Sequence, residues 1–261
     1  MNILEKIVAD KYKEIALKKS LVPASQLEQS VLFSRNTASL ANALKNSSSG
    51  IIAEHKRRSP SKQTINQHTN VGQVAKAYEN AGACGMSVLT DIKYFGGSLE
   101  DLLLARASVS MPLLRKEFIV DEYQLLEAKA FGADIILLIA AVLTREQIKT
   151  LSETAKSLGL EVLLEVHNQE ELHKGLMPNV DMLGVNNRNL KTFTVSLETS
   201  KSLSKLIPAE FVKVSESGIS SIDAIKDLKT YGYHGFLIGE NFMKTENPGE
   251  SAKAFIHKLK N

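Results

Sequence analysis

The chain lacks several features that mark particular classes of protein. It has no tryptophan and a single cysteine, Cys84, among its 261 residues, so no disulfide can form within it. No uninterrupted apolar stretch approaches the roughly 18 residues of a membrane span, and charges interrupt the first segment at once. Charge of one sign does not dominate either, since 32 basic residues face 29 acidic ones. We therefore expect a cytoplasmic protein without a nucleic-acid or membrane partner.

The sequence is also poor in metal-binding and nucleotide-binding patterns. Its six histidines show no pairing at the spacing of a metal site, so no metal is expected. Alternation along a strand is predicted to point His55 away from Glu54. We expect the same of His167 and Glu165, and interpret both histidines as packing or surface residues. No G-x-G-x-x-G turn follows the first apolar run, which disfavours an open doubly wound sheet, the main alternative to a barrel.

What the chain does have is a repeat of short apolar runs. Each run is rich in valine, isoleucine and leucine, as buried parallel strands are. The runs recur every roughly 20 to 35 residues, the length of a strand with a returning helix. Eight such units predict an α/β fold, a (β/α)₈ TIM barrel. The runs are Gly50–Ala53, Met86–Leu89, Pro112–Leu114, Asp134–Ile139, Leu160–Val166, Met182–Val185, Phe211–Val214 and Gly235–Ile238.

The segments between the runs carry helix signals. Thr144 and Gln147 have the spacing of a capping box, and Gly159 is placed to end the helix that follows. Asp121 is predicted to cap another helix, and Ser220–Tyr231 repeats the plan. Residues 1–48 lie outside the repeat and are predicted to form a helical extension of the same domain, with the barrel at 49–261. The extension is expected to hold helices at Ile3–Lys19, Ala24–Phe33 and Leu40–Lys45.

Polar residues stand directly after several of the runs, where barrel enzymes carry their reactive groups. Because residues two apart on a strand share a face, these side chains are expected to meet at the barrel mouth. Two interpretations remain open. One is a structural ion-pair network; the other is an acid–base set in which burial lowers the pKa of lysine and raises that of glutamate. The residues concerned are Glu54, Lys56, Lys116, Glu165, Asn186 and Arg188.

Glycine turns follow the last two runs. Ser217-Gly218 and Gly239-Glu240 each precede a predicted helix. Backbone N–H groups at such turns favour phosphate, and the seventh and eighth loops are the usual phosphate site of these barrels. Two ordinary strand-to-helix turns that need glycine would give the same pattern. Their joint position favours an anion site.

At this point the motifs resemble those of a known family. IIAEHKRRSPSK (51–62) and PLLRKEFIVDEYQLLEA (112–128) resemble the specific first-strand and third-strand motifs of indole-3-glycerol-phosphate synthases. Further matches follow in the same order along the barrel, over roughly 50 to 245. They are SVLTDIKYFGGSLEDL (87–102), LLEVHN (163–168), LGVNNRNLKTF (183–193), VSESGI (214–219) and GFLIGENFM (235–243).

The resemblance implies a carboxy-lyase of tryptophan biosynthesis that needs no metal or organic cofactor. Its reaction closes the ring of 1-(2-carboxyphenylamino)-1-deoxyribulose 5-phosphate to give indole-3-glycerol phosphate, carbon dioxide and water. By motif, Lys116 is the general acid at the substrate carbonyl, and Glu165 is the main partner for proton transfer in the later dehydration. Lys56 holds an anionic group of the substrate, and Glu54 orients Lys56 and Lys116.

The resemblance also implies a set of binding residues. Asn186, Arg188 and Ser217 position the substrate, with Arg188 suited to the carboxylate that leaves. Two further groups surround the phosphate and pack on the aromatic ring. They are Ser59, Gly218, Gly239 and Glu240 for the phosphate, and Phe95 and Leu190 for the ring.

One position departs from the family pattern. Gln63 stands where the family commonly has glycine, in the first strand-to-helix loop, so the mobility of that loop is open. Two other functions stay in view. A phosphoribosyl anthranilate isomerase would need a cysteine or aspartate where the first strand offers Glu54 and Lys56, and a non-catalytic sugar-phosphate-binding protein would not need Lys116 with Glu165. The expected partners are the sugar-phosphate substrate and other tryptophan-pathway enzymes, with the chain a monomer or weak homo-oligomer.

Overall fold

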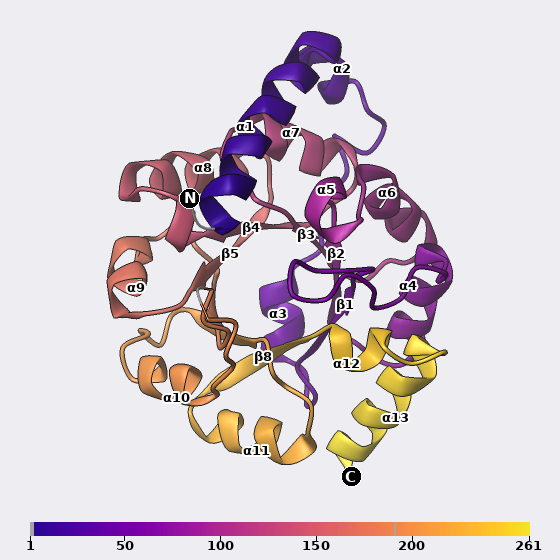
Figure 1. The fold of residues 1–261 in the computed structure, drawn as a ribbon, viewed down its shortest axis with the longest axis vertical. Helices are drawn as coiled ribbons and strands as arrows, with labels where there is room; N and C mark the ends of the chain where they lie inside the picture. Colours follow the sequence, from indigo (N-terminus) through magenta and orange to yellow (C-terminus); the bar gives the residue numbers. More distant parts are fainter. Residues whose placement is uncertain (1–2, 191) are drawn as a thin grey trace.

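The computed structural model describes residues 3–190 and 192–261, and its centre is a closed barrel of parallel strands (Figure 1). The strands follow one another around the barrel in chain order, and the last pairs with the first to close it. Each predicted apolar run overlaps one strand, so the (β/α)₈ prediction is confirmed. The strands are β1 (Ile51–His55), β2 (Gly85–Leu89), β3 (Leu113–Lys116), β4 (Ile135–Ile139), β5 (Glu161–Val166), β6 (Met182–Asn186), β7 (Val212–Glu216) and β8 (Tyr233–Ile238).

Helices surround the barrel and three more precede it. The extension holds α1 (Ile3–Leu21), α2 (Ala24–Glu28) and α3 (Leu40–Lys45). Those that follow are α4 (Val71–Asn80), α5 (Ile92–Phe95), α6 (Leu99–Ser108), α7 (Tyr123–Ala130), the short 3₁₀ turn η1 (Ala140–Val142), α8 (Arg145–Ser157), α9 (Gln169–Gly175), α10 (Glu198–Ser204), α11 (Ile222–Thr230), α12 (Glu240–Met243) and α13 (Pro248–Lys260). Within the described residues, none of these helices is both long and apolar enough to cross a membrane.

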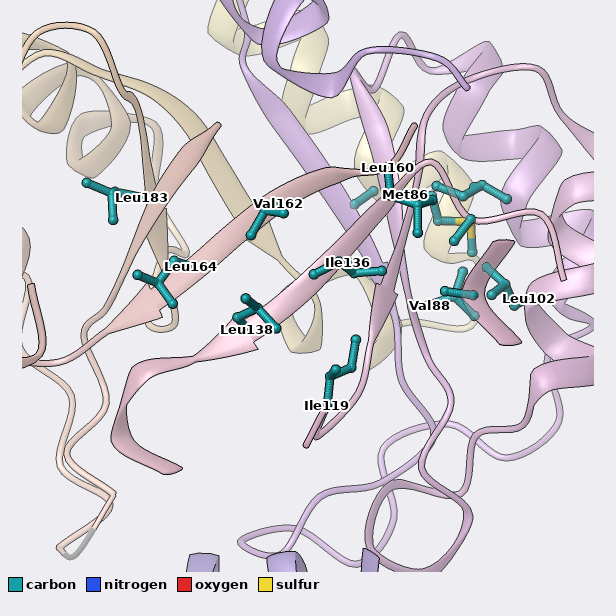
Figure 2. Close-up of a cluster of buried hydrophobic side chains, with 14 of the residues drawn as sticks. Met86, Val88, Leu102, Ile119, Ile136, Leu138, Leu160, Val162, Leu164 and Leu183 are labelled. Carbon is teal, nitrogen blue, oxygen red and sulfur yellow. The ribbon is translucent and has the colours of Figure 1, made fainter. Parts of the chain in front are cut away.

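Alternation along each strand divides the core into two layers. On β4, Ile135, Leu137 and Ile139 pack inside the barrel. Ile136 and Leu138 pack outward against the helices, with the neighbouring strands contributing to the same layer (Figure 2). Successive side chains of a strand point to opposite faces, and here both faces are buried. This explains why the runs are continuous and not alternating in hydrophobicity.

The extension covers both ends of the barrel. At the N-terminal end of the strands, α3 crosses the barrel axis (Figure 1) and places Leu40 and Leu44 against it. A Cβ added to Gly85 would lie 2.8 Å from Leu40 Cδ1, and one added to Gly235 would lie 3.0 Å from Leu44 Cδ1. Glycine at these two positions therefore leaves space for the Leu40 and Leu44 side chains of α3. At the opposite end, α1 brings Ile7 into the interior layer.

A buried lysine fixes α1 over the mouth. Lys11 is only 2% exposed, and its Nζ lies 3.0 Å from Asp91 Oδ2 and 3.2 Å from Glu117 Oε1. It also lies 2.8 Å from Glu14 Oε2 on its own helix. Burial opposes the ammonium, but these carboxylates outweigh it and raise the pKa of Lys11. The cation therefore ties the extension to the loops after β2 and β3.

Replacing Lys11 with methionine is expected to destabilise the fold by about 3–5 kcal/mol, because it leaves buried carboxylates without their cation. Urea unfolding followed by circular dichroism measures the change. Lys13→Met on the exposed face of the same helix is the matched control. A Lys11→Met protein as stable as this control would contradict the assigned role.

Local helix signals were right in part. The capping box at Thr144 and Gln147 forms as predicted. Asp121 is not the N-cap residue of α7, which is Glu122. The Asp121 carboxylate lies one residue earlier and accepts a hydrogen bond from the Tyr123 N–H at 2.9 Å. The second helix of the extension ends at Glu28, short of the prediction, and Ser30 follows. The Ser30 hydroxyl accepts from Leu32 N–H and donates to Ala130, and such local bonds compete with the helix.

Candidate active site

A cavity of about 380 Å³ opens at the C-terminal ends of the strands. Such barrels carry their active sites at this end. All the site residues named from the sequence line it, which brings together residues of β1, β3, β5 and β6 with the loops after β1, β2, β6, β7 and β8. They are Glu54, Lys56, Ser59, Phe95, Lys116, Glu165, Asn186, Arg188, Leu190, Ser217, Gly218, Gly239 and Glu240. Their chemical roles remain predictions.

Strand register explains why the charged groups meet. Leu163 packs inside the barrel, so Glu165, two residues further, also points inward. In the pairing of neighbouring strands, Glu165 stands level with Ile139 and Gly184. On the next pair, Asn186 stands level with Glu216. The last inward positions of β1, β3, β5, β6 and β7 therefore contribute to one polar layer above an apolar core.

Lys116 lies at the centre of this layer. Its Nζ is 3.1 Å from Glu165 Oε2 and 2.5 Å from Glu216 Oε2. Burial disfavours the ammonium, yet Glu216, Glu165 and Glu54 outweigh it and raise the pKa of Lys116. The expectation that burial lowers the pKa of a site lysine is therefore wrong here, because the surrounding carboxylates dominate. The Lys116 side chain is held in its ammonium form.

Glu54, on β1, belongs to the same polar layer and is buried beside Lys56. Lys56 Nζ lies 2.8 Å from Glu54 Oε1, and the Ser87 hydroxyl donates to Oε2 at 3.2 Å. Burial raises the pKa of Glu54, but Lys56 and Lys116 outweigh it and hold the pKa below its ordinary value. A Cβ added to Gly239 would lie 2.5 Å from Glu54 Oε1. Glycine at this position leaves room for the Glu54 carboxylate.

Glu216 is a site residue that the sequence analysis did not select. It lines the cavity, is 1% exposed, and its Oε1 has no hydrogen-bond partner within the described residues. Burial raises its pKa and Lys116 opposes this, but Glu165 and Glu54 add to burial, giving about 7. A side chain at Gly184 would collide with its Oε1. The signal was available: Glu216 lies two residues after the inward Val214, which ends the seventh run, and it is the last residue of β7.

The raised pKa of Glu216 has a consequence for stability. A carboxyl with a folded pKa of about 7 and an ordinary value of 4.5 holds its proton in the folded chain after the unfolded chain has lost it. This contribution to stability is present at acid pH and disappears as the pH rises through about 7. The unfolding free energy is therefore expected to fall between about pH 5 and about pH 8, and to fall less in Glu216→Gln, which has no carboxyl to titrate at this position. Urea melts at several pH values measure it; identical pH curves for both proteins would contradict the raised pKa.

The loops after β7 and β8 form one end of the cavity. Ser217 and Gly218 have φ angles of 68° and 75°, which turn the chain sharply as it leaves β7. Gly239 is the N-cap residue of α12, whose Phe242 and Met243 N–H groups donate to the Gly239 carbonyl oxygen, and the N–H groups that precede them are those a helix start leaves without intrahelical partners. Lys62 lies across this end, its Nζ 2.9 Å from Glu240 Oε1. Glycine turns, a helix start and lysine together suit a phosphate group.

Part of the cavity wall is apolar. Phe95 and Phe118 have ring centroids 6.0 Å apart, and Leu190 also lines the cavity. The first helix adds apolar residues to this wall, among them Leu4 and Ile7. Nothing in the sequence pattern indicated that the extension lines the cavity. The wall is suited to a flat aromatic ring.

His55 and His167 were both predicted to point away from the neighbouring glutamates, and the structure confirms this for His55 alone. His55 points away from Glu54, with its Nε2 3.4 Å from Thr69 Oγ1; burial and then Arg57 lower its pKa to about 4. The prediction for His167 was wrong. It lies two residues after Glu165, so the two share a face, and its Nε2 lies 3.5 Å from Glu165 Oε1.

The fold and this site define a (β/α)₈-barrel enzyme whose cavity holds a lysine–glutamate cluster. A family model described as indole-3-glycerol phosphate synthase matches residues 4–258. An indole-3-glycerol phosphate synthase of Bacteroides thetaiotaomicron is 49% identical over 255 residues, covering 98% of each chain. One of Acinetobacter baumannii is 42% identical over 256 residues, covering 98% of this chain and 96% of its own. The chain belongs to the indole-3-glycerol phosphate synthase family.

Solved structures of other barrels share the fold. The 3-hexulose-6-phosphate synthase of Salmonella typhimurium superposes with a TM-score of 0.64 at 14% identity, covering 80% of this chain and 98% of that one. The KGPDC of Streptococcus mutans gives a TM-score of 0.60 at 16% identity, covering 80% and 96%. At such low identity these two structures bear on the fold alone.

Proposed function

We propose that the protein converts 1-(2-carboxyphenylamino)-1-deoxyribulose 5-phosphate into indole-3-glycerol phosphate, with release of carbon dioxide and water. The observation that carries the proposal is Lys116. A buried ammonium, held by Glu165 and Glu216, faces a cavity with an anion end and an apolar end. This substrate has a phosphate, a ketone and an aromatic ring in that order along its length. The cavity offers a fitting group to each.

The substrate would lie across the mouth between the two ends. Its phosphate would take the backbone N–H groups around Gly218 and Gly239, and its ring would pack on Phe95. Arg188 suits the ring carboxylate, which it can bind with two parallel N–H donors. Its Nη1 now donates to the Phe193 backbone oxygen at 3.3 Å, a contact that a carboxylate would replace or share. The ketone would then sit beside Lys116.

The first chemical step closes the ring. The aromatic carbon that carries the carboxylate attacks the ketone carbon, and Lys116 gives a proton to the ketone oxygen as it becomes a hydroxyl. The carboxylate then leaves as carbon dioxide, and its bonding electrons restore the aromatic ring. Glu216 and Glu165 hold the lysine in place for this transfer.

The second step removes water. The new hydroxyl leaves with a proton, and the CH₂ group beside the nitrogen loses a hydrogen to give the second ring's double bond. This step needs an acid and a base: Lys116, once it has regained a proton from solvent, would protonate the leaving hydroxyl, and Glu165, whose Oε2 lies 3.1 Å from Lys116 Nζ, would take the proton from the CH₂ group. Glu54 would hold Lys56, whose ammonium faces the same space.

Indole fluorescence tests the proposed reaction directly. The chain has no tryptophan, so a rise in indole emission on mixing with substrate comes from product. A steady rise is expected. No rise, with binding of the substrate still measurable, would move the function to the isomerase or to a sugar-phosphate-binding protein.

The setting of the enzyme follows from the same proposal. The ligand is a small sugar phosphate, which a cavity of this size can hold. We propose that the extension (1–48) and barrel (49–261) act as one domain, because α1 supplies part of the cavity wall. A cytoplasmic monomer or weak homo-oligomer, with other tryptophan-pathway enzymes as partners, remains our proposal.

A further inference from the structure

A histidine outside the proposed catalytic set lies behind Glu165. His167 follows β5 and is largely buried, with 11% of its side chain exposed. Its Nδ1 lies 3.0 Å from Glu171 Oε2, and its backbone N–H donates to the same oxygen at 2.8 Å. Its Nε2 lies 3.5 Å from Glu165 Oε1 and is buried without a hydrogen-bond partner in the described part of the chain. The imidazole thus bridges two carboxylates.

Glu165 consequently has a basic side chain beside each of its oxygens. Oε2 contacts Lys116 at 3.1 Å, and Oε1 faces His167. The 3.5 Å separation is longer than a hydrogen bond, but a side-chain movement of a few tenths of an ångström would form one. Contacts of this kind in empty sites often tighten when substrate binds. Glu171, on α9, fixes the ring plane from the other side.

The charges around His167 favour the imidazolium. Burial opposes it, but Glu171 and Glu165 outweigh burial, with a smaller contribution from Glu216, and the pKa of His167 is raised. The pKa of Glu171 is lowered in turn, since His167 outweighs its burial. For Glu165, burial is outweighed first by Lys116 and then by His167. The facing groups are therefore three carboxylates and, beyond Glu165, the Lys116 ammonium.

We propose that His167 is a positioning residue for proton transfer at Glu165. Glu171 holds Nδ1–H, which leaves Nε2–H for Glu165 Oε1. This contact fixes the orientation of the Glu165 carboxylate. The imidazolium also supplies positive charge next to Glu165. This charge matters when Lys116 gives its proton to substrate, because neutral Lys116 no longer offsets the negative charge of the surrounding carboxylates. The inference rests on the proposed role of Glu165 in dehydration.

The pH dependence of turnover separates this role from a structural one. In His167→Gln, loss of the imidazolium raises the pKa of Glu165, so the acid limb of the kcat profile should move up by about one pH unit. On the acid limb kcat should therefore fall about tenfold, while KM stays within about twofold. Glu171→Gln keeps the ring in place but weakens its charge, so it should move the limb in the same direction. His173→Gln, exposed on α9, is the matched control and should leave the profile unchanged.

A uniform fall in kcat with an unmoved acid limb would overturn the proposal, because a packing defect has no preferred pH. Ionisation of the substrate affects all the variants equally, so the test is the difference in the position of the acid limb between each variant and the unmodified protein.

Histidine titration by NMR tests the contact without turnover. Linkage between two sites is reciprocal, so Glu165→Gln should lower the pKa of His167 by an amount comparable to the shift of the acid limb. An unmoved His167 titration in Glu165→Gln would overturn the contact itself. Full indole formation by Glu165→Gln with a shifted His167 titration would instead sink the proposed role of Glu165, so the two failures are distinguishable.

Discussion

Replacing Lys116 with methionine is expected to reduce indole formation by about 10²–10⁴-fold, the range for loss of a general acid. Methionine fills similar space but cannot protonate the ketone oxygen as the new carbon–carbon bond forms. Substrate should still bind, since Lys56, Arg188 and the glycine turns are unchanged. KM is therefore expected to change far less than kcat. Steady-state indole fluorescence at saturating substrate measures both constants.

The control for this variant must exclude a folding defect. Without the ammonium, Glu165, Glu216 and Glu54 face one another, so their carboxyl pKa values should rise and the fold should weaken as pH rises. Circular dichroism at the assay pH checks that the variant is folded. Lys213→Met is the matched substitution, because this lysine is the second residue of β7, at the far end of the barrel, and donates to Ser204 O at 2.7 Å. A folded Lys116→Met protein with normal turnover would refute the mechanism.

The barrel was predictable because each of its strands is buried on both faces. A run such as that of β4 must be apolar at every position, since Ile135 packs inside and Ile136 packs against the helices. Such runs stand out against the amphipathic helices between them. Ends of elements were less predictable, because hydrogen bonds to distant segments decide them. Ser30, which ends its helix early, donates to Ala130 in α7.

The site was predictable where a charge ends an apolar run. Glu54, Lys116 and Glu165 each occupy the last inward position of a strand, and strand geometry alone brings them together. Glu216 has the same placement, so its omission was an error of selection. His167 was misplaced because residues two apart share a face, and the alternation rule was applied in the wrong sense there.

Other parts of the site depend on long-range packing. The approach of α1 to the cavity rests on Lys11, which contacts Asp91 and Glu117 across a long stretch of sequence. No local pattern carries this information. The pKa of Lys116 is of the same kind, because its direction depends on how many carboxylates reach the ammonium. Residue types at strand ends therefore predict which residues line the site better than they predict the pKa values of those residues.

Glu165→Gln is expected to separate the two chemical steps. Glutamine keeps the shape of the side chain and can still accept from Lys116 through its oxygen, but it cannot take up a proton. Ring closure and decarboxylation should proceed, while dehydration should slow by about 10²–10⁴-fold, as expected for loss of a general base. A single turnover with enzyme in excess should release carbon dioxide from carboxyl-labelled substrate without a matching rise in indole fluorescence.

The ratio of the two products decides the outcome. Glu170→Gln, exposed at the start of α9, should release carbon dioxide and indole in step, as the unmodified protein does. Equal losses of both products in Glu165→Gln would place its action at or before ring closure, where Lys116 acts. Unimpaired indole formation would remove Glu165 from the mechanism. Carbon dioxide without indole is the result that Lys116 Nζ and Glu165 Oε2, 3.1 Å apart and facing one cavity, lead us to expect.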